Sequence, residues 1–141
     1  MAQFARWQLC TWEVAKMGAK NYRDLIAWQK AFGLISEIYR ETALFPIEEK
    51  YGITAQLRRA SVSVPSNIAE GEGRDSKREF RHHLSIARGS LRELETQILL
   101  SVELGYLKPK SADRIIVPTE EVSCLIRGLS NSLKSASSDQ C

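Results

Sequence analysis

The chain has 141 residues, of which 43% are hydrophobic and 26% are charged, and its formal net charge is +3. This length and composition suit one globular domain. The apolar runs are too short to span a membrane, and charged residues interrupt the N-terminal segment, so we expect neither a transmembrane helix nor a secretory leader and place the protein in the cytoplasm.

The two ends of the chain are expected to lie outside the folded domain. Residues 1–20 are interpreted as a poorly ordered N-terminal extension, because no cap or periodic pattern extends the few apolar residues there. A docked strand or helix is the alternative. Residues 136–141 are small and polar, and we expect a disordered tail. The predicted domain therefore covers residues 21–135.

The first helix is predicted from residue 22 to about residue 42. Asp24 near its start suits N-terminal capping and the positive end of the helix dipole. Apolar residues recur at three- and four-residue steps, as on the buried face of a helix. The residues of this stripe are Leu25, Trp28, Phe32, Ile35, Tyr39 and Thr42. We expect its aromatic side chains to lie in the core.

The second helix is predicted to begin at Pro46, which suits a first turn, and to contain Gly52 in its interior. Its apolar stripe is Ile53, Leu57, Ala60, Val64 and Ile68. Pro65 lies inside this pattern, where proline usually kinks a helix. Gly71 and Gly73 are expected to end the helix in the left-handed conformation.

Two further helices follow. Ser76 and Glu79 have capping-box spacing at the start of the third helix, and Gly105 is expected to end it. The stripe of the third helix is Phe80, Leu84, Ala87, Leu91, Leu94 and Ile98. Ser111 is predicted to cap the fourth helix, in which Pro118 should cause a kink or a restart. Its stripe is Ile115, Thr119, Val122, Ile126, Leu129 and Leu133.

Four amphipathic helices with short connections predict an all-α fold, an up-down-up-down antiparallel four-helix bundle. Several strings in it resemble one known family: Gln56-Leu-Arg-Arg-Ala60, Asn67-Ile-Ala-Glu-Gly71, Arg74, Glu79-Phe80 and Ile86-Ala-Arg-Gly-Ser-Leu91. This is the four-helix-bundle family of the 23S rRNA intervening sequence protein, which includes proteins similar to the accessory variability determinant of diversity-generating retroelements. The resemblance covers residues 22–134. Its most specific part contains Pro65, Asn67, Glu70, Gly71 and Gly73.

The resemblance implies a small helical protomer with a basic surface that assembles into a ring-shaped homo-oligomer, with a pentamer favoured. It does not imply an enzyme. From the residues alone, Asn67 and Glu70 are expected to be structural: they could hydrogen-bond backbone groups near the glycine corner or pair with Arg58 or Arg59. Some helices carry a second row of apolar residues beside the main stripe, such as Leu99 with Val102 and Leu34 with Ile38. These rows are consistent with contacts between subunits of a homo-oligomer.

Positive charge is concentrated at the start of the third helix. Between residues 74 and 92 there are six basic and two acidic residues, so this stretch is more positive than the whole chain. The basic residues are Arg74, Lys77, Arg78, Arg81, Arg88 and Arg92. The five arginines lie within about 40° of one line on a helix, away from the apolar stripe. Phosphate binding, salt bridges between subunits and a solvated face all remain open interpretations.

The sequence gives little indication of a disulfide framework, a metal site or an enzyme. Cys10, Cys124 and Cys141 are odd in number and widely spaced, which argues against a disulfide framework and a metal site. His82 and His83 are adjacent, whereas two ligands of one metal would be three or four residues apart. We therefore expect no metal, no cofactor and no enzymatic activity.

The predicted function is binding of RNA or a nucleoprotein through the basic helix face. The alternative is an oligomeric scaffold or adaptor that binds a protein partner such as a reverse transcriptase. No membrane partner is expected.

Overall fold

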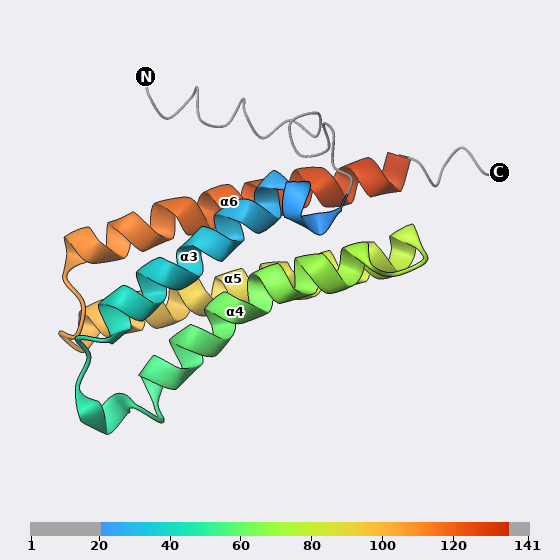
Figure 1. Cartoon of the computed structure of the whole chain (residues 1–141). Helices are drawn as coiled ribbons and strands as arrows, with labels where there is room; N and C mark the ends of the chain where they lie inside the picture. Colours follow the sequence, from blue (N-terminus) through green and yellow to red (C-terminus); the bar gives the residue numbers. More distant parts are fainter. Residues whose placement is uncertain (1–20, 136–141) are drawn as a thin grey trace, which may run out of the picture.

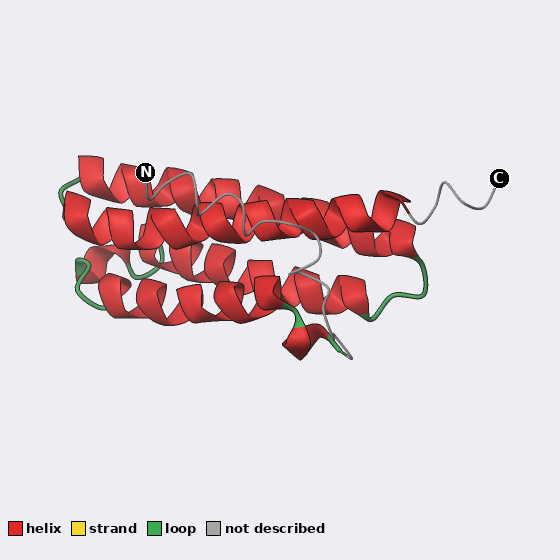
Figure 2. Ribbon diagram, turned by 90° about the horizontal axis from the view of Figure 1, so that it is seen from above, coloured by secondary structure: helices red, strands yellow, loops and turns green. Residues whose placement is uncertain are grey.

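The computed structural model describes residues 21–135, which are helical and contain no strand (Figures 1 and 2). The long helices are α3 Ile26–Thr42, α4 Ile53–Glu72, α5 Lys77–Glu103 and α6 Pro109–Ser135. Two short 3-10 turns, η1 Tyr22–Asp24 and η2 Ile47–Glu49, precede α3 and α4. The expected extension (1–20) and tail (136–141) lie outside the described residues.

Successive helices run in opposite directions and pack side by side (Figure 1). α3 packs on α4, α4 on α5 and α5 on α6, and α6 closes the bundle against α3. In the described part of the chain, the backbone of α3 does not come close to that of α5, nor the backbone of α4 to that of α6. The four helices therefore stand at the corners of a square, and the α3–α4 face lies opposite the α5–α6 face. The predicted all-α, four-helix fold is confirmed.

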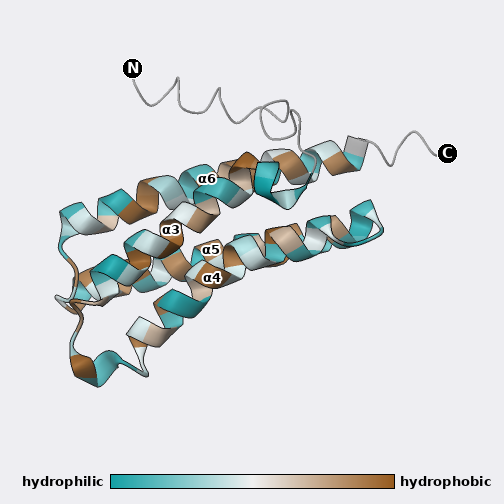
Figure 3. Cartoon of the chain, in the orientation of Figure 1, coloured by the Kyte–Doolittle hydropathy of each residue, from teal (hydrophilic) through white to brown (hydrophobic). Residues whose placement is uncertain are grey.

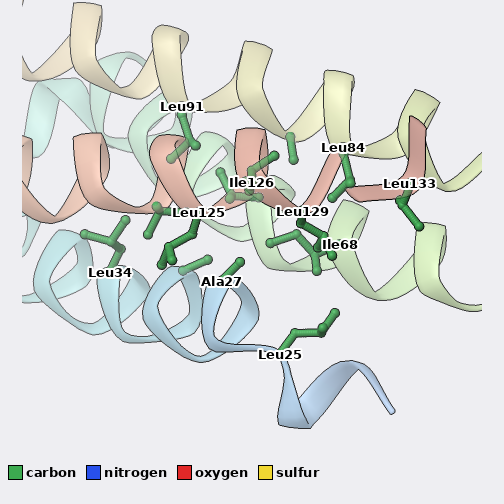
Figure 4. Close-up of a cluster of buried hydrophobic side chains, with 14 residues drawn as sticks. Leu25, Ala27, Leu34, Ile68, Leu84, Leu91, Leu125, Ile126, Leu129 and Leu133 are labelled. Atoms are coloured by element: carbon green, nitrogen blue, oxygen red, sulfur yellow. The ribbon is translucent and has the colours of Figure 1, made fainter. Parts of the chain in front are cut away.

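The core follows the predicted stripes on three of the four helices. All five stripe residues of α4 are buried, and so are the five of α5 from Leu84 to Ile98 and the six of α6. They form two clusters, one toward each end of the bundle. Figure 4 shows the first, where Leu84 and Leu91 of α5 meet Ile126 and Leu129 of α6. This burial is the main favourable term holding the bundle together.

The stripe predicted for α3 is wrong in its middle, whereas its ends Leu25 and Thr42 are buried as predicted and Trp28 packs partly against the core. Phe32 is 55% exposed and Tyr39 is 43% exposed. The buried residues are instead Ala27, Ala31, Leu34 and Ile38, with Leu25 and Thr42 at the ends. The buried face is thus shifted by one residue, or about 100° around the helix. Two small alanines face the core and let α3 approach its neighbours closely, while the bulkier aromatic side chains occupy the flank.

The second helix begins later than predicted. Pro46 precedes the short turn η2, and α4 begins only at Ile53, so Gly52 is its N-cap and does not lie in its interior. The Glu49 carboxylate accepts a hydrogen bond from the Ile53 amide at 3.1 Å. The Tyr106 hydroxyl donates to the other carboxylate oxygen at 3.2 Å. The pKa of Tyr106 is raised above its ordinary value, mainly by burial of the hydroxyl and secondly by this hydrogen bond.

The helices α4 and α5 end in different backbone conformations. α4 continues through Pro65 and Gly71, and Gly73 has φ −75°, so the predicted left-handed ending is wrong. Among the described residues, only Gly105 has a positive φ, at 78°. It follows α5 as predicted, and the Tyr106 amide donates to the Ser101 carbonyl at 2.9 Å, the bond typical of a Schellman motif.

The start of α5 is also as predicted, because the Ser76 hydroxyl accepts a hydrogen bond from the Glu79 amide at 3.1 Å. α6 begins at Pro109, two residues before the predicted cap Ser111, and runs through Pro118 without a restart.

Two findings bear on the classes of protein considered from the sequence. Within residues 21–135, no helix is long and apolar enough to cross a membrane. Cys124 of α6 is half-buried and disulfide-bonded. The odd number and wide spacing of the cysteines did not predict this bond.

Candidate nucleic-acid interface

The basic row predicted from the sequence starts in the turn before α5 and continues along that helix. Its residues are Arg74, Lys77, Arg78, Arg81, Arg88 and Arg92. All except Arg81 are exposed, and Arg81 is half-buried. The row begins at the α4–α5 corner, which is strongly hydrophilic (Figure 3). Because Leu84, Ala87 and Leu91 occupy the core-facing side of the same helix, the arginines are held along one flank.

That flank borders α6 and lies away from α4. His83 and Ser90 of α5 hydrogen-bond to α4, so they mark the opposite side of the helix. Arg92 instead lines a groove of about 160 Å³ between α5 and α6, which Arg127 of α6 also lines. Sequence reasoning missed Arg127, because its position beside Arg92 depends on how α6 packs against α5. Glu95 and Glu120 line the same groove, so its charge is mixed.

Few of these cations are paired within the chain. Arg92 contacts Glu95 at 2.9 Å, and Arg74 lies 4.0 Å from Glu70. Both arginines are exposed, and such pairs contribute about 0–1 kcal/mol each. Within residues 21–135, Lys77, Arg78 and Arg88 form no ion pair. The Nε atom of Arg81 is buried without a hydrogen-bond partner. Lys77, Arg78 and Arg88 are therefore available to an anionic partner.

The residues of the family-like motif hold the α4–α5 corner together. The Asn67 amide donates to the Ser63 carbonyl at 2.9 Å, and its oxygen lies 3.2 Å from Nδ1 of His83. The Ser63 and Ser90 hydroxyls are 2.8 Å apart, which adds a second polar bridge between the helices. Of the two alternatives left open from the sequence, Asn67 takes the first, a bond to a backbone group near Pro65. Glu70 is exposed and faces Arg74, and it does not pair with Arg58 or Arg59.

Gly71 is buried where α5 passes close to α4. A Cβ atom there would lie 2.7 Å from Cδ2 of Phe80 and 2.8 Å from Cβ of His83. Pro65 is buried inside α4, and Gly73 is exposed just after the helix. These positions shape the packing of the corner, and none of them presents a reactive group. The basic row and the motif are therefore separate features of the same hairpin.

The fold and the site define a four-helix-bundle protein with a row of cations along one helix flank. A family model described as 23S rRNA-intervening sequence protein matches residues 23–128, so the chain belongs to this family. The resemblance seen in the sequence is thereby confirmed.

A crystal structure from Bacteroides thetaiotaomicron has the same fold. It is a protein of unknown function from the S23 ribosomal protein family, with a TM-score of 0.69 and 22% identity. The match covers 74% of this chain and 98% of the other chain. No curated protein matches this chain significantly.

Proposed function

We propose that this protein is a non-enzymatic, cytoplasmic RNA-binding module whose basic row on α5 contacts the phosphate backbone. The observation that carries the proposal is the set of exposed cations Lys77, Arg78 and Arg88, which have no ion pair within residues 21–135. A guanidinium group suits this role, because its planar fork can donate to two phosphate oxygens at once. The family's name refers to an rRNA intervening sequence and states no binding partner, so the proposal rests on the charges of the row.

The polar residues between α4 and α5 support a non-catalytic role. A serine nucleophile needs a base within hydrogen-bond distance of its hydroxyl. The Ser63 hydroxyl instead bonds to Ser90 and to the Asn67 amide. His83 bonds to the Asn67 oxygen, and its role there is to link two helices.

The direct test is equilibrium binding of two RNAs of equal length and unrelated sequence, followed by fluorescence anisotropy. The row offers no aromatic side chain for base stacking, so phosphate contacts should dominate and the two affinities should agree within about threefold. A strong preference for one sequence, or no binding at low salt, would contradict phosphate-dominated recognition.

We further propose that the chain self-associates into the ring-shaped homopentamer that the resemblance implies, with the α3–α4 face as one of the two different surfaces that each protomer of a ring must use. Phe32 and Tyr39 of α3 and Val62 of α4 are exposed apolar residues there. Trp28 stacks on Phe32 with ring centroids 4.9 Å apart. Exposed aromatic residues are typical of the centres of protein interfaces. Since this face lies opposite α5–α6, assembly through it leaves the basic row accessible.

Replacing Phe32 by glutamate should weaken this assembly, because the new carboxylate would lie in an apolar contact. We expect sedimentation velocity at micromolar concentration to show an oligomer for the unmodified chain and a shift toward the monomer for Phe32→Glu. Asn131→Glu, which adds the same charge at an exposed polar position of α6, away from this face, is the matched control. A monomeric unmodified chain, or an oligomer unaffected by Phe32→Glu, would rule out this face as the interface.

The second candidate function is an adaptor that binds a protein partner such as a reverse transcriptase. It is favoured by three exposed leucines near the end of α5: Leu99, Leu100 and Leu104. On this alternative, the charges of α5 would serve contacts between proteins. RNA affinity that does not depend on the basic row would favour it.

A further inference from the structure

The groove between α5 and α6 is lined by charged residues from both helices. Arg92 and Glu95 line it from α5, and Arg127 and Glu120 line it from α6. Arg127 and Glu120 are exposed and seven residues apart. Seven residues make about two helical turns, so the two side chains lie on the same flank of α6. This flank therefore presents a cation and a carboxylate at different levels of the groove.

Both helices change the sign of their charge along this groove. α5 begins at the α4–α5 corner, and α6 runs in the opposite direction and ends at the same end of the bundle (Figure 1). On each helix the cation is therefore nearer that end than the carboxylate. Arg92 precedes Glu95 on α5, and Arg127 follows Glu120 on α6. The part of the groove toward the α4–α5 corner is thus positive on both sides, and it continues the basic row of α5.

Arg127 is the cation that α6 adds to this positive part. Among the described residues it forms no ion pair, so its guanidinium group can bind an external acceptor. Arg92, on the other side, contacts Glu95 at 2.9 Å. An ion pair between exposed side chains is weak, so a phosphate group can compete for Arg92.

The size of the groove suits contact with part of a longer chain. Its volume of about 160 Å³ is below the ~300–1,000 Å³ of pockets that enclose a small molecule. A nucleic-acid backbone needs no enclosing pocket, because arginine and lysine contact its phosphate oxygens from the outside.

We infer that the RNA-binding surface extends across the groove onto α6, where Arg127 contacts phosphate and Glu120 marks the limit of the surface. This inference rests on the proposed RNA-binding function and deepens it, because it adds a second helix to the basic row of α5. Glu120 repels phosphate groups, as Glu95 does on the other side. Bound RNA is thereby confined to the half of the groove nearer the α4–α5 corner.

Substitutions at the two α6 positions should change RNA affinity in opposite directions. Arg127→Gln removes one phosphate contact, so we expect binding about three- to tenfold weaker at low salt and a log–log salt slope shallower by about 0.7. Glu120→Gln removes a repulsive charge, so we expect binding about two- to fivefold tighter. Fluorescence anisotropy with a single-stranded RNA of mixed sequence measures both. A damaged fold does not explain a gain of affinity, so Glu120→Gln keeps the test valid even if Arg127→Gln disturbs α6.

Each variant has a control with the same change of charge outside the groove. Arg114→Gln alters the same type of residue near the start of α6, where Arg114 contacts Glu41 of α3 at 3.5 Å. Glu48→Gln removes an exposed carboxylate on η2. Both controls should change the affinity by less than about twofold.

The inference is overturned if Arg127→Gln weakens binding no more than Arg114→Gln does, or if Glu120→Gln strengthens it no more than Glu48→Gln does. If charge reversal at Lys77, Arg78 and Arg88 still abolishes binding in that case, only the extension onto α6 is wrong. If the unmodified chain does not bind RNA at low salt, the proposed function is wrong as well.

Discussion

Replacing Gly71 by alanine should lower the free energy of unfolding by about 1–3 kcal/mol, the usual cost of forcing extra volume into a packed interior. The added Cβ atom would lie 2.7 Å from Cδ2 of Phe80, 2.8 Å from Cβ of His83 and 3.2 Å from the Phe80 carbonyl oxygen. Two of these neighbours are a backbone oxygen and a Cβ atom, so the contact cannot be relieved by a rotamer change alone. α4 and α5 would have to separate.

Gly89→Ala is the matched control for this substitution. Gly89 lies inside α5, and a Cβ atom there would meet nothing within 4 Å. Since alanine favours the helix over glycine by about 0.5–1 kcal/mol, this variant should be as stable as the unmodified chain or more stable. Urea unfolding followed by circular dichroism measures both. If the two variants behave alike, close packing at Gly71 does not stabilise the corner.

Charge reversal on α5 should abolish RNA binding and leave the fold intact. We choose Lys77, Arg78 and Arg88 for replacement by glutamate, because they are exposed and unpaired within residues 21–135. Arg81 is spared because its Nε atom is buried, and Arg92 because it contacts Glu95. Losing three phosphate contacts and adding three repulsive charges should reduce affinity on the order of a hundredfold or more at low salt.

The control for charge reversal changes the net charge equally elsewhere in the bundle. Lys108, Lys110 and Arg114 are exposed around the start of α6, and replacing them by glutamate should reduce affinity by less than about fivefold. Equal losses for both triple variants would show that only overall charge matters. Unchanged binding by the α5 variant would favour the protein-adaptor alternative. Dissociation of the α5 variant into monomers would assign these cations to subunit contacts.

The sequence predicted most of the fold, because three helices carry a single clear apolar stripe. On α3 two stripes run side by side, and the pattern could not decide between aromatic residues and the neighbouring alanines. The bundle selects Ala27 and Ala31, because small residues permit close approach of the helices. Gly71 was read as a helix end, although its role depends on the position of Phe80 on the next helix.

The candidate site was also partly predictable from helical periodicity. Helical spacing alone aligns the arginines of α5 on one flank, so the row needs no tertiary information. The burial of the Arg81 Nε atom depends on tertiary packing, and the place of Arg127 in the same groove as Arg92 depends on how α6 packs against α5.

The central claim is that the basic row of α5 binds phosphate, and the salt dependence of RNA affinity tests it most directly. With about three to five contacts per chain and about −0.7 per contact for single strands, the slope of log affinity against log salt should be near −2 to −3.5 per subunit. The variant with glutamate at 77, 78 and 88 should show a slope shallower by about 2. A slope near zero in the unmodified chain, or the same slope in both proteins, would contradict the claim.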